Sequence, residues 1–273
     1  MPFVITALII LTVLLALYIF LICPTFRRHP DREIMRGLKV AHRGLHSIFE
    51  DTPENSIPAF KKAIEYGFAI ETDIHITADG EVVIFHDDSL VRMCGVEGRP
   101  EDMTLSELKK LKLGGTEHTL PTLRELLELV DGKVPLLIEF KTKSPKTCVP
   151  LCHAANEILK DYKGKYFMQS FYPPAVMWYR RHRKDILRGQ LSSGYFKEKG
   201  IHMKALSCLL LNCLSRPDFV SYEYKFPKHL SLVICKALGA HIAGWTYTEQ
   251  KQIDETKNTF STHIFEQFIP ENK

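Results

Sequence analysis

Beyond residue 38 the sequence alternates between short apolar runs and longer amphipathic runs, and this alternation limits the possible folds more than any other feature. The strand-like runs occupy residues 39–42, 69–74, 82–86, 134–140, 166–169, 186–191, 218–221, 240–246 and 261–265. The helical patterns occupy residues 57–66, 105–111, 123–130, 147–159, 175–183 and 229–238. Because strands that alternate with helices form parallel sheets, the pattern predicts an α/β fold.

The number of strand–helix units favours a closed barrel. About eight units in roughly 240 residues predict a (β/α)₈ TIM barrel. An open doubly wound sheet is the alternative, although no glycine-rich nucleotide motif follows a strand-like run. Residues 77–80 are too few for a helix, and Asp79-Gly80 favours a tight turn, so the repeat is irregular there. Nine runs compete for eight places, and we expect one of the last three not to be a barrel strand.

The N-terminal 26 residues contain no charged side chain. Residues 4–22 are apolar apart from Thr6, Thr12 and Tyr18, and such a run approaches the roughly 20 residues that a membrane-spanning helix needs. A cleavable signal peptide is the alternative, but no basic segment precedes the run and no small-residue cleavage site follows it. We therefore expect an uncleaved transmembrane helix.

Basic residues lie on only one side of this apolar run. They are Arg27, Arg28, Arg32, Arg36 and Lys39. The positive-inside rule then places the rest of the chain in the cytoplasm. The 7 cysteines, which show no CxxC spacing, are typical of free thiols in a reducing compartment. We expect a membrane anchor over residues 1–26, a basic linker over 27–38 and one barrel domain over 39–273.

Polar residues end several strand-like runs, where barrel enzymes hold their reactive groups. They are His42 and Arg43 on the first run, Glu71 and Asp73 on the second, His86 and Asp87 on the third, Glu139 and Lys141 on the fourth, and Trp245 on a late run. Residues two apart on a strand point to the same side, so the three acids would share one small volume.

Three carboxylates in one volume would repel one another unless a cation lay between them. Glu71, Asp73 and Glu139 therefore predict a site for one divalent cation, Mg²⁺ or Ca²⁺, with Mn²⁺ as a third candidate. For any single acid, a solvated carboxylate or an ion pair with a nearby cation is the alternative.

The two histidines and two cations at the strand ends suit acid–base chemistry on an anion. His42 and His86 can act as general acid and base because imidazole titrates near neutral pH, although packing or metal binding is the alternative. Arg43 and Lys141 add the fixed positive charge that a phosphate group needs.

Several short motifs occur in a characteristic order. They are Ala-His-Arg-Gly at 41–44, Pro-Glu-Asn-Ser at 53–56, Glu-Thr-Asp at 71–73, Phe-His-Asp at 85–87, Leu-Pro-Thr-Leu at 120–123, Ile-Glu-Phe-Lys at 138–141, Gln-Ser-Phe at 169–171 and Gly-Trp-Thr at 244–246. This set resembles the glycerophosphodiester phosphodiesterase family, whose members are phospholipase C-like TIM barrels. Residues 261–266 depart from the family pattern, so hydrophobicity alone predicts the last strand.

The resemblance implies an enzyme that hydrolyses glycerophosphodiesters to sn-glycerol 3-phosphate and an alcohol. By the same resemblance, Glu71, Asp73 and Glu139 bind the metal, His42 and His86 are the acid–base pair, and Arg43 and Lys141 contact phosphate. Glu54 and Asn55 match a pair near the substrate, and Trp245 would either stack on the glycerol or close the barrel. Residues 88–115 match a small insertion after the third strand that would cover the substrate.

In the mechanism we expect, one histidine deprotonates the nucleophile, either the neighbouring glycerol hydroxyl or water, and the other protonates the leaving alcohol. A lysophospholipase D or a phosphoinositide-type phosphodiesterase is the first rival, because a membrane anchor favours lipid-derived substrates. A non-catalytic binding barrel is disfavoured by the presence of both histidines, all three acids and both cations. A net charge of +4 without a supporting motif argues against a nucleic-acid partner.

Overall fold

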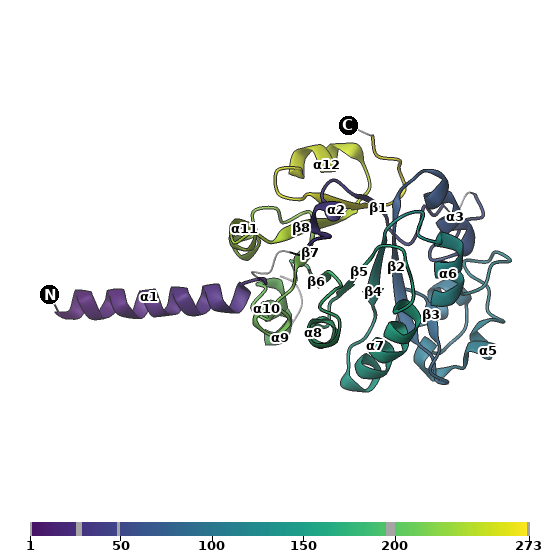
Figure 1. Cartoon of the computed structure of the whole chain (residues 1–273), viewed down its shortest axis with the longest axis horizontal. Coiled ribbons are helices and arrows are strands. Elements are labelled where there is room, and N and C mark those ends of the chain that lie inside the picture. The colour runs from purple at the N-terminus through teal and green to yellow at the C-terminus, as the bar shows by residue number, and fades with distance from the viewer. Residues whose placement is uncertain (1, 26–28, 48–49, 195–199, 272–273) are drawn as a thin grey trace.

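Eight parallel strands close into a barrel in the computed structural model, which describes residues 2–25, 29–47, 50–194 and 200–271 (Figure 1). The barrel strands are β1 (Lys39–Ala41), β2 (Ala69–Ile76), β4 (Leu136–Phe140), β5 (Tyr166–Ser170), β6 (Arg188–Ser192), β7 (Phe219–Glu223), β8 (His241–Tyr247) and β9 (Thr262–Phe265). Their order is β1-β9-β8-β7-β6-β5-β4-β2, and β1 also pairs with β2. This closure confirms the predicted TIM barrel and excludes the open sheet.

The ninth strand-like run is not where the sequence pattern suggested. All of the last three runs, β7, β8 and β9, are barrel strands, so the expectation that one of them lies outside the barrel is wrong. The extra strand is β3 (Val82–Ile84), which pairs antiparallel with the end of β2. The four-residue link between β2 and β3 allows only this hairpin, and Gly80 in it has φ 85°.

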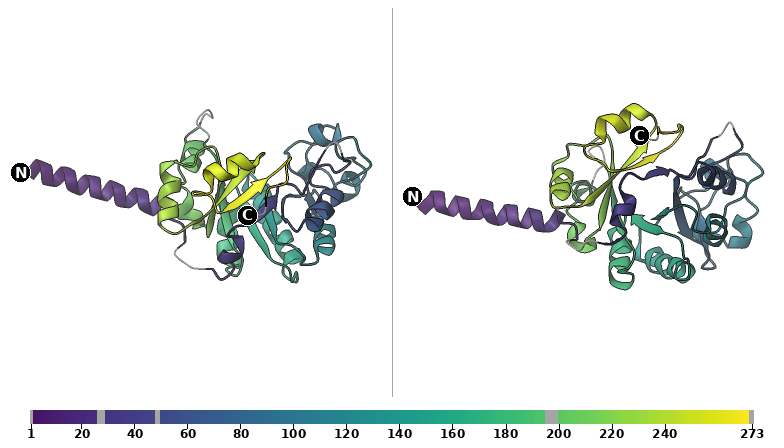
Figure 2. Two further views of the ribbon diagram at one scale, coloured as in Figure 1. Left: turned by 90° about the horizontal axis from the view of Figure 1, so that it is seen from above. Right: turned by 45° about the horizontal axis from the view of Figure 1, so that its top comes forward.

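Helices cover the outside of the barrel (Figure 2). The helices described after residue 31 are α2 (Arg32–Met35), α3 (Ile57–Glu65), α4 (Val91–Cys94), α5 (Leu105–Leu108), α6 (Leu123–Val130), α7 (Pro145–Leu159), α8 (Pro173–His182), α9 (Ile201–Ser207), α10 (Asn212–Ser215), α11 (Leu230–Ala237) and α12 (Gln250–Thr256), with a 3₁₀ turn η1 (Pro100–Asp102). Local signals begin several of them. In α6, Thr122 and Glu125 form a reciprocal capping box, and the apolar face that follows is buried.

An apolar layer fills the barrel toward the N-terminal ends of its strands. Its members are Val40, Ala69, Leu137, Phe167, Leu187, Phe219 and Ile264, with Met35 of α2 packed against them. Side chains alternate along a strand, so the next inward positions after Ala69 and Leu137 are Glu71 and Glu139. The apolar layer therefore forms a dry floor beneath the polar groups at the C-terminal ends of the strands.

The insertion after β3 contains α4, η1 and α5 and has a small core of its own. Its buried residues include Leu90, Leu108 and Leu113, which pack against Val83 and Phe85. Because β3 extends the last residues of β2, the insertion is attached directly above the strand that bears Glu71 and Asp73.

Helix α1 (Pro2–Ile22) projects away from the barrel, and only its last turn packs against α10 and α11 (Figure 1). It has no charged residue, and it is the one helix in the described part of the chain that is long and apolar enough to cross a membrane. The predicted apolar N-terminal helix is therefore present.

Candidate active site

Three carboxylates meet at the mouth of the barrel. Glu71 and Asp73 come from β2 and Glu139 comes from β4, and one oxygen of each lies within 4.8 Å of the other two. All three side chains are buried. Burial, followed by the negative charges of Asp73 and Glu139, raises the pKa of Glu71 well above its ordinary value.

Two cations stand beside these acids. Lys141 Nζ lies 2.9 Å from Glu139 Oε1 and 3.6 Å from Asp73 Oδ1, and Arg43 Nε lies 3.7 Å from Asp73 Oδ2. Burial opposes ionisation of Asp73, but Lys141, His86 and Arg43 hold its pKa well below the ordinary value. Burial also raises the pKa of Glu139, although Lys141 opposes this. The cluster is thus only partly neutralised by the protein.

The loop after β1 has a backbone shape that brings it against the acids. Arg43 and Gly44 have φ values of 54° and 80°, and a Cβ atom on Gly44 would lie 2.9 Å from the backbone carbon of Ala59. Glycine is therefore required at position 44. The turn directs the Arg43 N–H to Glu71 Oε2, which accepts it at 3.2 Å.

Asn55 connects the next loop to β2. Its Nδ2 donates to Asp73 Oδ2 at 2.9 Å, and its Oδ1 accepts from Thr72 Oγ1 at 2.9 Å. With these bonds made and a side chain only 2% exposed, Asn55 supports Asp73 and does not line the small pocket at the barrel mouth. Its neighbour Glu54 accepts from Arg43 Nη1 at 2.8 Å.

Each histidine at the mouth is held by a carboxylate through its Nδ1. His42 Nδ1 lies 2.6 Å from Glu266 Oε2, and His86 Nδ1 lies 2.6 Å from Asp87 Oδ1. Burial lowers the pKa of both imidazoles, and the neighbouring carboxylates oppose that shift. The Nε2 atom of each ring is left for other chemistry, with His42 Nε2 lying 3.9 Å from Glu71 Oε2.

Three residues of this network were given no role from the sequence, although Asp87 was noted at the end of the third strand-like run. Glu266 and Asp87 orient the histidines, and Arg92 of α4 binds both Asp87 and Glu54, with its Nε 2.6 Å from Asp87 Oδ2 and its Nη2 2.6 Å from Glu54 Oε1. Glu266 directly follows the last strand, so the rule that found Glu71 and Glu139 could have found it. No local pattern indicates Arg92, because its partners lie in two different segments.

A small pocket of about 100 Å³ opens between these groups. It is lined by His42, Arg43, Glu71, His86, Glu139, Gln169, Phe171, Leu191, Trp245, Thr246 and Ile264. The ring of Trp245 contacts Phe171 edge to face at 5.7 Å and also packs against the apolar floor. Its Nε1–H has no acceptor within the described residues. Trp245 thus lies between the apolar floor and the pocket.

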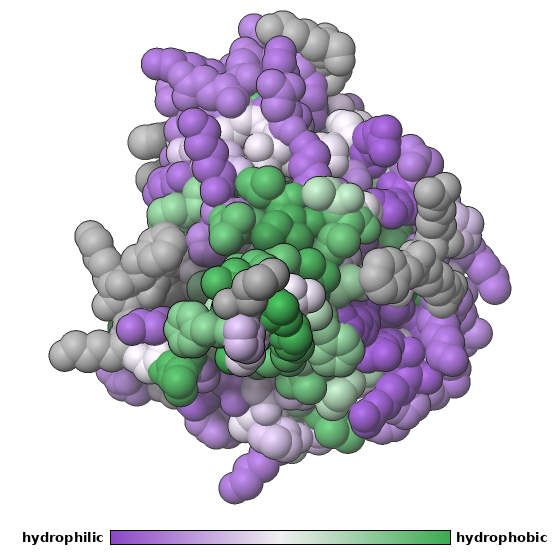
Figure 3. Space-filling model, turned by 90° about the vertical axis from the view of Figure 1, so that its left-hand side faces the viewer, coloured by the Kyte–Doolittle hydropathy of each residue, from purple (hydrophilic) through white to green (hydrophobic). Residues whose placement is uncertain are grey.

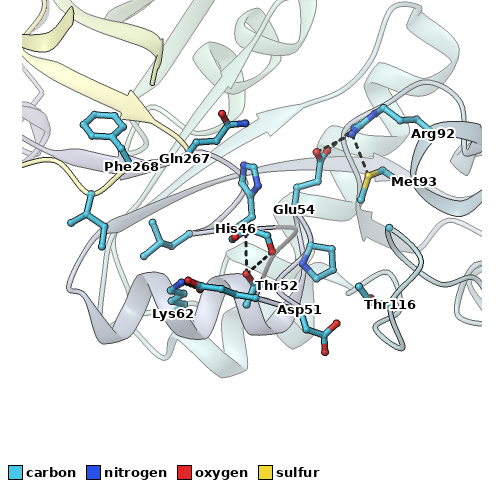
Figure 4. Close-up of a pocket in the computed structure, with 16 residues that line it drawn as sticks. His46, Asp51, Thr52, Glu54, Lys62, Arg92, Met93, Thr116, Gln267 and Phe268 are labelled. Carbon is cyan, nitrogen blue, oxygen red and sulfur yellow. Dashed lines mark hydrogen bonds and ion pairs between the residues drawn. The ribbon is translucent and has the colours of Figure 1, made fainter. Parts of the chain in front are cut away.

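A larger cavity of about 750 Å³ lies beside this pocket (Figure 4). The loop that contains His46 and Thr52, the insertion at Arg92 and Met93, and the chain after β9 form its walls. Figure 4 shows Glu54 and Arg92 joined at one wall, opposite Phe268. Since Glu54 also binds Arg43, the two hollows share a wall made of charged side chains.

The carboxylate cluster suits a hard divalent cation. Its donors are oxygens only, as Mg²⁺ and Ca²⁺ prefer, and Asp73 Oδ1 is buried and accepts no hydrogen bond within the described residues. A cation among Glu71, Asp73 and Glu139 would balance the negative charge that Arg43 and Lys141 do not neutralise.

Comparison with known proteins agrees with this arrangement. A sequence model of the glycerophosphoryl diester phosphodiesterase family matches residues 42–258. A glycerophosphodiester phosphodiesterase of Caldanaerobacter subterraneus is 40% identical over 117 residues, which are 40% of this chain and 46% of the relative. Glycerophosphodiester phosphodiesterase 1 of Bos taurus is 28% identical over 189 residues, 63% of this chain and 56% of the relative. The matched segments thus span about half the length of these curated relatives.

Solved structures share the barrel. A phosphodiesterase of Oleispira antarctica in complex with sn-glycerol 3-phosphate superposes with a TM-score of 0.71 at 23% identity, covering 86% of this chain and 94% of that one. A glycerophosphodiester phosphodiesterase of Thermotoga maritima superposes with a TM-score of 0.66 at 25% identity, covering 84% and 93%. Since the family model matches most of the chain, from the first site histidine to beyond β8, this chain belongs to the glycerophosphoryl diester phosphodiesterase family.

Proposed function

We propose that this chain hydrolyses glycerophosphodiesters to sn-glycerol 3-phosphate and an alcohol. The observation that supports this most strongly is the cluster of three buried carboxylates beside a pocket that both histidines line. Family membership and the product bound by the Oleispira antarctica enzyme support the same substrate class, a small-molecule or lipid-derived phosphodiester.

The proposed cofactor is one divalent cation held by Glu71, Asp73 and Glu139. Mg²⁺ and Ca²⁺ are the first candidates and Mn²⁺ is the third, because all the donors are carboxylate oxygens. When bound, the cation would polarise a phosphoryl oxygen. Arg43 and Lys141 would contact the phosphate, and the Trp245 ring would lie against the glycerol.

Proton transfer is assigned to His42 and His86. Since a carboxylate occupies Nδ1 of each ring, Nε2 is the atom that exchanges the proton. One histidine accepts the proton of the attacking hydroxyl, from the glycerol or from water, and the other donates a proton to the alcohol oxygen as its bond to phosphorus breaks. If the glycerol hydroxyl attacks, a cyclic phosphodiester forms first, and water opens it with the two roles reversed.

The test of this function is a product assay on the full chain purified in detergent. Release of sn-glycerol 3-phosphate is measured from glycerophosphocholine, glycerophosphoethanolamine and glycerophosphoinositol, with Mg²⁺, Ca²⁺, Mn²⁺ or EDTA. We expect EDTA to abolish activity and a divalent cation to restore it. Full activity after dialysis against EDTA would exclude the proposed metal site.

The histidine roles are tested by His42→Ala and His86→Ala. Each should lower kcat by about 100-fold or more, the usual contribution of acid–base catalysis, with the thermal midpoint nearly unchanged. His202→Ala, at an exposed position on α9, is the matched control. Near-normal turnover in either site variant would refute its assignment.

A second candidate function is lysophospholipase D activity. The cavity beside the pocket favours it, because Leu45, Met93, Phe268 and Ile269 give that cavity apolar walls that could hold an acyl chain. The two functions differ in product, since lysophosphatidylcholine would give lysophosphatidic acid and choline. The same assay with this substrate decides between them, and a phosphoinositide headgroup substrate tests the third possibility.

We also propose that α1 is an uncleaved single-pass anchor with the barrel in the cytoplasm. The end of α1 belongs to the barrel core: Ile22 is fully buried, and its carbonyl oxygen accepts from Asn212 Nδ2 at 2.9 Å. A removable signal sequence would leave that buried donor without its partner. In this proposal residues 1–26 are the anchor, 27–38 the linker and 39–273 the barrel domain. Intact-mass spectrometry of the purified chain detects cleavage directly.

A further inference from the structure

Several hydrogen bonds join the end of α1 to the barrel. Arg216 Nη1 donates to the carbonyl oxygens of Phe20 at 2.9 Å and of Cys23 at 2.8 Å, and its guanidinium lies 4.5 Å from the centre of the Phe20 ring. Tyr18 Oη and Ser231 Oγ share a hydrogen bond of 2.8 Å, and Cys235 Sγ donates to Ile22 O at 3.1 Å. Two carbonyls that the end of a helix leaves open, those of Phe20 and Ile22, are thus bound by α10, α11 and the residue that follows α10.

No spacer separates the exposed apolar part of α1 from the barrel. Leu14, Leu15 and Leu17 are about half exposed and have no charged neighbour on α1, whereas Ile22 is fully buried. A helix rises about 1.5 Å per residue, so roughly 7 Å separate Leu17 from Ile22. The headgroup layer on each side of a bilayer is also about 5–8 Å thick. If Leu17 is in hydrocarbon, the barrel surface around Ile22 must lie among the headgroups.

That surface carries exposed apolar side chains. Leu214 on α10 is 50% exposed, and Leu230 and Val233 on α11 are 64% and 48% exposed. Figure 3, which looks at the molecule along α1, shows apolar residues gathered around the base of the helix and hydrophilic residues farther out. The apolar patch is therefore continuous with the helix that leaves it.

We propose that this patch, formed by Leu214, Leu230 and Val233, is seated in the headgroup layer of a lipid bilayer, so that the barrel rests on the membrane in one fixed orientation. The occupant is lipid because an uncharged helix leaves the patch at its centre and its last turn is fixed to the same two helices. The inference rests on the proposed anchoring by α1 and is independent of the proposed chemistry.

The test measures the depth of tryptophans introduced into the full chain. Leu230→Trp and Leu214→Trp are made separately, and the chain is reconstituted into phosphatidylcholine–phosphatidylglycerol vesicles whose acyl chains are brominated either near the headgroup or near the chain end. Leu11→Trp in α1 is the inserted reference. Val149→Trp is the aqueous control, because Val149 is 46% exposed and belongs to α7, a helix that lies away from α1 in Figure 1. Emission beyond that of the two native tryptophans is the signal.

We expect the added emission of Leu230→Trp and Leu214→Trp to be lost to the shallow bromine, that of Leu11→Trp to the deep bromine, and that of Val149→Trp to neither. Quenching of Leu11→Trp alone would overturn the seated patch and leave the anchor in place. Quenching of none of the four would refute the anchor and the patch together. Two further results would also overturn the inference: equal quenching of Val149→Trp, or dimer mass in detergent with shielding of Leu230→Trp from aqueous iodide, which would assign the patch to a second copy of this chain.

Discussion

The Glu266 carboxylate holds His42 through a hydrogen bond to Nδ1, and it acts on the imidazole in two ways. It fixes the ring so that Nε2 is directed toward the pocket, and its negative charge raises the pKa of His42 against the lowering effect of burial. The His42 contact holds the pKa of Glu266 well below its ordinary value, although burial opposes this, so the carboxylate is ionised at neutral pH.

Glu266→Gln should therefore lower kcat by about tenfold or more, in the range found for residues that orient a reacting group. It should also move the limb of the pH–rate profile that reports His42 to lower pH, because the imidazole loses the charge that stabilises its protonated form. Glu266→Asp should recover part of the activity. Glu255→Gln, on an exposed acid of α12, is the control, and a pH profile that stays in place would show that Glu266 is structural only.

Glu71 gives a second prediction at this scale. Its raised pKa means that the folded, metal-free protein disfavours the ionised carboxylate. The free energy of unfolding therefore falls as pH rises above the ordinary pKa of glutamate. Glu71→Gln should raise the free energy of unfolding of the metal-free protein by about 1–3 kcal/mol at pH 8, since it removes a poorly compensated buried charge.

The same substitution should abolish stabilisation by the cation. Thermal unfolding with EDTA and with Mg²⁺ or Ca²⁺ measures both effects. A variant that is less stable than the parent without metal, yet is still stabilised by the cation, would contradict the assignment of Glu71.

Among the elements, α4 of the insertion is tied to the barrel mouth by Arg92. This side chain binds Asp87, which holds His86, and Glu54, which holds Arg43. Burial opposes ionisation of Asp87, but Arg92 and then His86 hold the pKa of that acid at about 2. The insertion thus positions His86 and Arg43 without lining the small pocket itself.

Arg92→Ala should lower kcat by about 10–100-fold, the usual cost of removing a residue that orients a site group, with a smaller change in KM. Arg92→Lys should restore little, because one ammonium cannot make the paired contacts of the guanidinium. Arg99→Ala, which removes an exposed cation from the same insertion, is the control. Equal losses in Arg92→Ala and Arg99→Ala would indicate that the insertion is merely destabilised.

The sequence predicted which segments form strands and helices, but it could not predict how the strands pair. Each strand-like run is a strand, and the α6 pattern over residues 123–130 is a helix with those bounds. Val82–Ile84 has the same short, buried pattern as a parallel strand; only its partner, the end of β2, determines that it lies outside the barrel. Pairing is a long-range property, so composition placed the irregularity at residues 77–80 but not the extra strand.

The sequence predicted those site residues that lie at the ends of strands. Asp73 and Glu139 are register partners on the adjacent parallel strands β2 and β4, and Glu71 is the inward position just before Asp73 on β2, so the three acids are neighbours. Arg92 and the support that Asn55 gives to Asp73 depend on loop geometry, including the positive φ of Asn55, which neither spacing nor hydrophobicity encodes.

For the whole molecule, two buried histidines in the last barrel strands make the stability of the fold depend on pH. Burial, then the cations Arg32 and Arg36, lowers the pKa of His241 to about 4. Burial, then Lys39, lowers that of His263 to about 4 as well. Unfolding returns both to about 6.5, so the unfolded chain binds more protons between these values, and stability is lost as pH falls from about 6.5 to 4.

We expect the thermal midpoint in detergent to fall across this pH range, with about 1.4 kcal/mol of stability at stake for each unit of pKa difference. His241→Gln should flatten the fall, because the amide does not titrate and can still donate to Thr262, the present partner of His241. His202→Gln is the exposed control. If the parent and His241→Gln lost stability in parallel, His241 would not be a source of the acid sensitivity.

The whole-molecule arrangement of α1 could not be read from its residues. The composition of a helix without charged groups does not indicate whether its end is free or packed against the barrel. Only the folded structure shows that Ile22 is part of a core with Leu209, Val220 and Leu232. Apolar composition predicted the helix; packing determines its direction.

The barrel closes between β1 and β9, and this seam sets an order of events during synthesis. Strand β1 leaves the ribosome early, yet Lys39–Ala41 needs His263–Phe265 as its neighbour. Glu266, which holds His42, emerges directly after β9. A nascent chain that has not yet reached Thr262 therefore has an open barrel and a His42 without its carboxylate. Strands β1 and β9 are thus synthesised far apart in time, and the candidate site is completed last.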